Sequence, residues 1–198
     1  MNNRKLCGGR ARLKAIVRTY VRKIRPRAQA EIDWFAHQPS LGAAIETAAL
    51  AVNSHGKRYS HQRRLKKAAL RQALRALLHE LEEIEQSRDF DELFRLINAA
   101  VKTIPGIGEL YVYDTSLRIG AKLNMFPTAI YLHAGTRLGA QALGLDDSAA
   151  TLKVSALPRE FRTLEPHELE DVLCIFKNEL KTKANPVVHD IAKRSWCH

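Results

Sequence analysis

Apolar residues recur at three- or four-residue spacing through most of this chain, and this period constrains the fold more than any other feature. In the longest such stretch, residues 61–86, the spacing places a continuous apolar stripe on one face of a helix. The stripe consists of Leu65, Ala69, Ala73, Leu77, Leu81 and Ile84. No segment of useful length alternates apolar and polar residues as a half-buried strand would. The sequence therefore predicts an all-α fold.

Residues that start and stop helices divide the rest of the chain. Pro26 is expected to end a first short helix, Gly144 to close a later one, and a last helical stretch to follow Pro186. The expected helices are 13–21, 28–37, 41–52, 61–86, 91–103, 110–123, the later part of 129–143, and 165–182. We therefore expect a basic N-terminal arm or helix at residues 1–27, followed by one compact helical domain at residues 28–198.

Length and composition fit a soluble globular protein. The chain has 198 residues, of which 45% are hydrophobic and 27% charged, a balance that supports a packed core. No apolar run approaches the roughly 20 residues needed to cross a bilayer, and no secretory apolar segment follows Met1. We therefore expect no membrane association and a cytoplasmic location, on the nucleoid if the source is bacterial.

Three cysteines, Cys7, Cys174 and Cys197, are scattered along the chain, and none belongs to a C-x-x-C pair. A zinc site or an iron–sulfur cluster built from cysteines is therefore not expected. An odd number of cysteines in a cytosolic setting also argues against a disulfide framework. The sequence predicts free, mostly buried thiols, with no metal and no cofactor.

Positive charge is concentrated in the first part of the chain. The net charge is +11, and residues 1–75 carry 18 Lys and Arg against 3 Asp and Glu, whereas residues 76–198 carry 14 against 18. Such an uneven basic surface is typical of a protein that binds a polyanion. A basic soluble protein without such a partner has the same charge. If the partner is a polyanion, double-stranded DNA is the first candidate. An anionic membrane surface, RNA and an acidic protein are the alternatives.

The pentapeptide Ile104-Pro105-Gly106-Ile107-Gly108 lies between two amphipathic helical segments. The proline ends the first helix, and the two glycines allow backbone conformations that other residues resist while presenting no side chain. The two isoleucines are expected to pack the turn between its helices. Backbone N–H groups of the turn and of the following helix can then approach a phosphate closely. Gly106, Ile107 and Gly108 are therefore candidate DNA-binding residues.

This pattern resembles the helix-hairpin-helix element of DNA-repair and DNA-processing proteins, here at about residues 91–123. The resemblance implies a clamp that holds the phosphate backbone without reading base sequence. Members of that family often carry Lys or Arg after the second glycine, whereas Glu109 and Leu110 stand there in this chain. Lys102 and Arg118 are the nearest cations that can replace that contact.

A polar loop before the longest helix is a second candidate contact with DNA. It interleaves hydrogen-bonding side chains, one tyrosine and four cations, which suits a loop that reaches phosphates and probes a gap between bases. Its candidate DNA-binding residues are Asn53, Lys57, Arg58, Arg63 and Arg64. Arg137 is a further candidate phosphate ligand. A solvated loop with no ligand is the alternative.

Beyond the hairpin, about residues 40–180 resemble the endonuclease III-like superfamily of helix-hairpin-helix DNA glycosylases in the order of their elements. The resemblance assigns Asn53 to the residue that fills the gap left by a flipped base. It also assigns residues 127–133 to the segment with the catalytic aspartate, but that segment ends in His133 and contains no aspartate. Leu110 stands where some members carry a Schiff-base lysine.

Asp114 and His133 remain as candidates for acid–base catalysis, and Tyr111, Tyr113 and Tyr131 as candidates to stack on an extruded base. The alternatives are that Asp114 bonds a neighbouring residue of its helix or faces solvent, that His133 is an interior histidine with a hydrogen-bond partner, and that the tyrosines are core or boundary residues. Two hypotheses therefore compete. The first is a DNA glycosylase-like enzyme that acts on a damaged or modified base. The second is a non-catalytic DNA-binding module of the same fold, which the missing aspartate favours.

Overall fold

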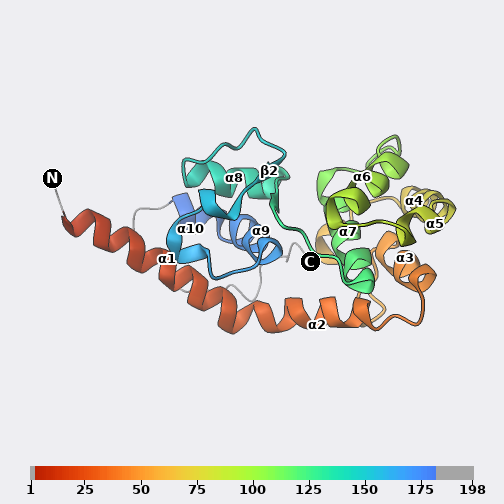
Figure 1. Cartoon of the computed structure of the whole chain (residues 1–198), viewed down its shortest axis with the longest axis horizontal. Helices are drawn as coiled ribbons and strands as arrows, with labels where there is room; N and C mark the ends of the chain where they lie inside the picture. The colour runs from red at the N-terminus through yellow and green to blue at the C-terminus, as the bar shows by residue number, and fades with distance from the viewer. Residues whose placement is uncertain (1–2, 182–198) are drawn as a thin grey trace. The chain divides into compact units, whose positions relative to one another are not determined.

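The structure is a computed structural model that describes the backbone of residues 3–181 and the side chains of residues 9–181. These residues form an all-α protein, as the sequence predicts, with one short antiparallel pair of strands (Figure 1). No helix in this part of the chain is both long enough and apolar enough to cross a membrane. The helices and strands are α1 (Asn3–Lys23), α2 (Arg25–Ala36), α3 (Leu41–Ala49), α4 (Lys67–His79), α5 (Leu81–Glu85), α6 (Phe90–Val101), α7 (Glu109–Leu123), β1 (Ile130–Tyr131), α8 (Ala134–Ala142), β2 (Thr151–Leu152), α9 (Pro166–Ile175) and α10 (Lys177–Lys181).

Two compact units divide the chain. The middle unit consists of residues 28–127, and the terminal unit combines residues 3–27 with residues 128–181 of the described chain. One boundary between the two units falls at residue 27. The residues after 127 do not continue the domain that begins at residue 28, because their apolar side chains share a core with α1.

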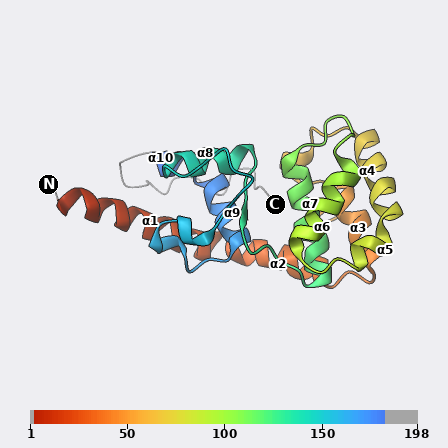
Figure 2. The same cartoon turned by 45° about the horizontal axis from the view of Figure 1, so that its top comes forward.

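In the middle unit, α7 packs against both α3 and α6, and α4 also packs on both of these helices (Figure 2). Every residue of α7 from Tyr111 to Ala121 is buried. This buried stretch includes four polar residues, Asp114, Thr115, Ser116 and Arg118. Polar groups that are buried on all sides must find hydrogen-bond partners inside the protein. The centre of this unit therefore holds a polar network as well as an apolar core.

In the terminal unit, α1 contributes an apolar face to the core around α8 and α9. The buried residues of that face are Leu13, Ile16 and Tyr20, and Ile24, directly after α1, belongs to the same core. The axes of α8 and α9 approach closely at Gly139, where an added Cβ would lie 2.2 Å from the carbonyl oxygen of Leu173. Only glycine permits this approach.

The single helix expected at residues 61–86 is interrupted twice. Residues 60–62 form a separate 3-10 turn, and α4 begins only at Lys67. Glu80, with φ −93° and ψ 19°, then separates α4 from α5. The first interruption arises because residues 61 and 62 turn inward to bond a buried side chain of α7. An apolar period cannot reveal such a tertiary bond.

A proline and a glycine mark two of the helix boundaries in the structure. The first helix, α1, ends at Lys23, shortly before Pro26. Pro26 also lies in the first turn of α2, where its missing N–H has no acceptor to lose. Gly144 closes α8 as expected, with φ +70° and a hydrogen bond from Leu145 N to Ala140 O. The stretch expected after Pro186 lies outside the described residues.

Candidate functional site

The two helices predicted around the Ile-Pro-Gly-Ile-Gly pentapeptide are present as α6 and α7. Ile107 N donates to Ile104 O at 3.1 Å, and Gly106 has φ of +91°. Proline at the second position and glycine with positive φ at the third are the residues that a type II turn requires. Ile104 is buried and Ile107 is half-buried against the core of the middle unit, so both pack as predicted.

The start of α7 is open to an incoming anion. Its N-cap, Gly108, is extended (φ −127°, ψ 179°) and provides no side-chain cap. Val112 N donates to Gly108 O at 3.2 Å, whereas the amides before it have no carbonyl within the helix to bond. A Cβ at Gly106 or Gly108 would meet no atom within 4 Å. A negatively charged group can therefore reach the positive end of the α7 dipole without meeting these side chains.

The loop before α4 is a folded element of its own. Val52 pairs with Arg58 in an isolated antiparallel bridge. Within this loop, Asn53 Oδ1 accepts hydrogen bonds from the amides of His55 and Lys57, each at 3.0 Å. Asn53 stabilises its own turn, so the gap-filling role implied by the resemblance would require both hydrogen bonds to break.

Asp114 lies at the centre of a buried polar cluster. Its Oδ2 accepts hydrogen bonds from His61 Nε2 at 2.8 Å, Gln62 Nε2 at 2.9 Å and Arg118 Nη2 at 3.4 Å. Arg118 Nη1 also donates to Gln62 Oε1, and its guanidinium lies 3.8 Å from the centroid of the Tyr59 ring. The cluster fixes the loop to α7. Arg118 is therefore buried within the protein, contrary to its predicted contact with DNA.

Most of the cations that were predicted to bind DNA are exposed. The predicted DNA-binding residues Lys57, Arg63, Arg64 and Lys102 are all exposed. The exposed basic residues that continue into α4 are Lys66, Lys67, Arg71 and Arg75. Arg58 differs, because it is half-buried and its Nη2 donates to Leu65 O at 2.6 Å, which closes the loop on itself.

The basic loop and the hairpin are joined to the same end of α7. Asp114 is the sixth residue of α7, so it anchors the loop about 8 Å along the axis from the helix start. One turn nearer that start, the Tyr111 hydroxyl donates to Ala49 O at 2.8 Å and anchors the end of α3. The exposed cations and the open amides therefore belong to one region of the middle unit.

The three tyrosines predicted to stack on a base are all buried. Burial raises the pKa of the Tyr111 hydroxyl, which is bonded to a main-chain carbonyl. The Tyr113 ring packs edge-on against Phe90, with ring centroids 6.4 Å apart. Tyr131 lies in β1 of the terminal unit and pairs with Thr151 of β2. All three rings contribute to packing within their own units, and none is exposed for stacking in this conformation.

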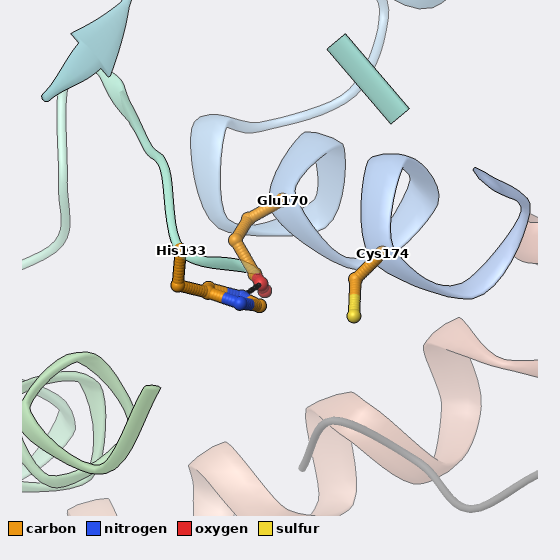
Figure 3. Close-up of side chains that lie close together, drawn as sticks. All are labelled: His133, Glu170 and Cys174. Atoms are coloured by element: carbon orange, nitrogen blue, oxygen red, sulfur yellow. Dashed lines mark hydrogen bonds and ion pairs between the residues drawn. The ribbon is translucent and has the colours of Figure 1, made fainter. Parts of the chain in front are cut away.

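His133 and Asp114, predicted as an acid–base pair, belong to different units, and each has its own partner. His133 is the N-cap of α8: its Nδ1 accepts a hydrogen bond from Gly135 N at 3.2 Å. Its Nε2 is hydrogen-bonded to the buried Glu170 of α9 (Figure 3). A ring nitrogen that accepts a hydrogen bond carries no proton, so the ring is neutral with its proton on Nε2. Both nitrogens therefore have structural roles.

Arg137, a predicted phosphate ligand, also serves the structure of the terminal unit. Its Nη1 donates to the carbonyl oxygens of Asp147 and Ala149, each at 2.8 Å, and its Nη2 donates to Leu132 O at 3.2 Å. The half-buried guanidinium thus ties the segment before β2 to the end of β1. These contacts leave the predicted contact with DNA without support.

Cys174, four residues after Glu170 on α9, completes a buried cluster with His133. One possible metal-ligand atom from each of these residues lies within 4.8 Å of the other two. Cys174 is disulfide-bonded, so the prediction of a free thiol is wrong for this residue. The side chains of Cys7 and Cys197 lie outside the described part of the chain. The spacing of cysteines in the sequence does not reveal this cluster, because two of its three members are not cysteines.

The sequence also does not reveal which residues bond Asp114 and His133. His61 and Gln62 are 53 and 52 residues from Asp114, and Glu170 is 37 residues from His133. No spacing rule connects residues at such separations. The one available signal was Asp114 itself, because a carboxylate in a helix that is buried on every side requires donors from elsewhere.

No family model matches this sequence, and no curated protein or solved structure is significantly similar to it.

Proposed function

We propose that the middle unit binds duplex DNA by gripping its phosphate backbone, without reading base sequence. The start of α7 carries this proposal: a type II turn followed by Gly108 leaves the first-turn amides accessible at the positive end of a buried helix. Backbone N–H groups at such a position bind a phosphate by hydrogen bonds and charge, and they make no contact with base edges.

The exposed cations support DNA over a small isolated anion. Lys57, Arg63 and Arg64 belong to a loop that is fixed to the first two turns of α7 through Asp114. Because the loop is pinned, ordering these side chains on a phosphate backbone costs less conformational entropy than ordering a mobile loop. Several exposed cations and an uncapped helix start that are joined to the same helix suit a polymer of phosphates, from which each contact releases counterions.

The geometry favours the binding module over the glycosylase. Glycosylase-like chemistry requires a carboxylate or an equivalent group beside an extruded base. Asp114 has no exposed surface, and His61 Nδ1 is a buried atom in this conformation. The three tyrosines are core residues, and His133 belongs to the terminal unit. The proposal is therefore a non-catalytic DNA-binding module.

Fluorescence anisotropy of the full chain with labelled duplexes of two unrelated sequences tests this proposal. We expect similar affinity for both duplexes and a linear fall of log K with log salt concentration. About four to six phosphate contacts give a slope of roughly −4 to −5. An affinity that does not change with salt would overturn the phosphate clamp. Binding to anionic vesicles but not to duplex would instead assign the basic surface to a membrane.

Two charge-matched double variants localise the contact. Arg63→Ala/Arg64→Ala removes two exposed cations from the loop, and Arg88→Ala/Arg95→Ala removes two exposed cations from the region of α6. We expect the loop variant to lose about tenfold or more in affinity and about two units of salt slope, and the control to lose less than about twofold. An equal loss in both variants would mean that diffuse attraction, and not this surface, drives binding.

A further inference from the structure

Three buried side chains of the terminal unit converge at a place that the DNA-binding proposal does not use. His133 comes from the start of α8, and Glu170 and Cys174 come from α9 (Figure 3). A nitrogen, a carboxylate oxygen and a sulfur of these residues all lie within 4.8 Å of one another. Imidazole, carboxylate and thiolate are the three side-chain ligand types that Zn²⁺ takes in proteins. We propose that these three residues bind one Zn²⁺ ion when Cys174 is reduced.

The backbone brings the three ligands together by identifiable means. Glu170 and Cys174 are four residues apart, so they are neighbours on one face of α9. Gly135 allows the start of α8 to approach that face, because a Cβ there would lie 2.5 Å from Cys174 Sγ. His133, two residues earlier, is held in place by its bond with Gly135 N. The convergence is therefore part of how α8 packs on α9.

The donor set selects zinc over other common divalent ions. Ca²⁺ and Mg²⁺ take oxygen ligands, and here one of three ligands is sulfur and one is nitrogen. Zn²⁺ accepts this mixture and a tetrahedral arrangement without electronic preference. Three protein ligands leave the fourth position for water or a further donor.

The surrounding charge also favours a cation. Glu168, Glu170 and Asp171 are all buried on α9. Arg25 pairs with Glu168, whereas the hydrogen bond to Asp171 from the Tyr20 hydroxyl comes from a neutral group. The His133 ring that bonds Glu170 is neutral too, as its bond with Gly135 N requires. A divalent ion bound by Glu170 would bring positive charge next to three acids that are buried close together on α9.

Zinc binding at His133 Nε2 requires a defined proton movement. The proton now on Nε2 moves to Nδ1, which ends the hydrogen bond from Gly135 N. The Cys174 thiol releases one proton to solvent as its sulfur bonds the metal. α8 keeps the other half of its capping box, in which Thr136 Oγ1 accepts a hydrogen bond from His133 N at 2.7 Å.

Oxidation state decides whether the site can form. Cys174 is disulfide-bonded in this structure, and a disulfide sulfur is not a thiolate ligand. A phosphine reductant converts the disulfide and one water into two thiols and a phosphine oxide. The proposal therefore requires zinc binding by the reduced chain and its absence in the oxidised chain.

Cobalt titration of the full, metal-free chain tests this directly, because Co²⁺ reports its ligands by absorption. After phosphine reduction we expect one equivalent of Co²⁺ to produce a thiolate-to-cobalt charge-transfer band and the visible bands of four-coordinate cobalt. One equivalent of Zn²⁺ should remove both sets of bands, and the oxidised chain should show neither. A reduced chain without a charge-transfer band would overturn the proposal.

Variants assign the ligands. Cys174→Ser should abolish the charge-transfer band, and Glu170→Gln and His133→Asn should each weaken cobalt binding by more than about 100-fold, beyond the usual effect of losing an outer partner. Asparagine at position 133 retains an N-cap for α8, which favours folding of that variant. His79→Asn, an exposed histidine of α4, is the matched control and should bind as the unmodified chain does. Unchanged binding by Cys174→Ser would also overturn the proposal.

A second measurement needs no variant, so it stands even if the substituted chains do not fold. Reduced chain is treated with iodoacetamide, and the alkylation of the peptide that contains Cys174 is followed by mass spectrometry. One equivalent of Zn²⁺ should slow this alkylation by about tenfold or more, and Mg²⁺ should not. A rate that Zn²⁺ leaves unchanged would contradict the assignment of Cys174 as a ligand.

Discussion

The helices α7 and α8 begin with the same backbone geometry and use it in opposite ways. The N-cap of each has φ −127° and ψ 179°. In the middle unit that residue is Gly108, which is exposed and provides no side-chain cap. In the terminal unit it is His133, which is buried and caps α8 within a capping box that Thr136 completes. The N-cap side chain therefore decides whether the first-turn amides are left for an external ligand.

The two units also neutralise their buried carboxylates differently. Asp114 lies against the Arg118 guanidinium, together with His61 and Gln62. Glu170 is bonded to the neutral ring of His133, on a helix with two further buried acids. Asp114 therefore lies in a cluster that includes an arginine, whereas Glu170 lies in a cluster of possible metal ligands. This contrast is consistent with the proposed phosphate contact at the start of α7 and the proposed zinc site beside the start of α8.

Among these variants, His133→Ala is expected to have the largest effect. The substitution removes the cap of α8 and leaves a buried carboxylate without its histidine, so we expect the terminal unit to lose about 3 kcal/mol or more of stability. Urea unfolding gives the magnitude, and hydrogen exchange of the α8 and α9 amides assigns it to this unit. His133→Asn keeps a cap and should lose about 1 kcal/mol less. Equal losses would mean that the cap itself contributes little.

A smaller effect is expected when α7 is given the cap that α8 already has. In Gly108→Ser the serine hydroxyl can accept a hydrogen bond from a first-turn amide, and the surrounding space admits the Cβ. We expect a few tenths of a kcal/mol of added stability and about tenfold weaker DNA binding, because the amide is then occupied. Anisotropy titration measures the second effect.

The matched control removes a cap from the same unit. Ser40 Oγ accepts a hydrogen bond from Ala43 N at 3.1 Å at the start of α3. Ser40→Gly should therefore lower stability slightly and leave DNA affinity unchanged. If Gly108→Ser binds DNA as well as the unmodified chain does, the amides of α7 are not the phosphate site.

The sequence predicts the start of α7 much better than the start of α8, because the residues that determine the first are adjacent and those that determine the second are not. The α7 start was identified in detail because its residues lie next to one another: proline, two glycines and two isoleucines specify the turn locally. The sequence does not predict that His133 caps α8, because histidine is not a usual N-cap and because its partner Glu170 lies 37 residues away.

The fold, too, could be predicted only as far as local patterns of apolar residues determine it. Helical period correctly identified an all-α protein and the helices on both sides of the hairpin. It placed an unbroken helix over residues 61–86, since nothing in the period records that His61 and Gln62 bond Asp114. It also could not show that residues 128–181 share a core with α1, because shared apolar faces at long sequence separation leave no local signal.

The smallest effect concerns Glu109, the residue that departs from the basic pattern of the helix-hairpin-helix family. It is exposed in the first turn of α7, where its charge suits the helix dipole but repels a phosphate at the same amides. Glu109→Gln should raise DNA affinity about two- to threefold at low salt, with the gain shrinking as salt screens the repulsion. Stability should fall by a few tenths of a kcal/mol, because the favourable interaction with the dipole is lost.

Glu85→Gln removes the same charge from an exposed position of α5 and is the control for net charge. If the phosphate binds at the start of α7, the gain from Glu109→Gln should exceed that from Glu85→Gln at every salt concentration tested. Equal gains would mean that Glu109 acts only through the overall charge of the unit. The open amides of Gly108 and its neighbours would then lose their role as the contact, and the exposed cations alone would have to account for binding.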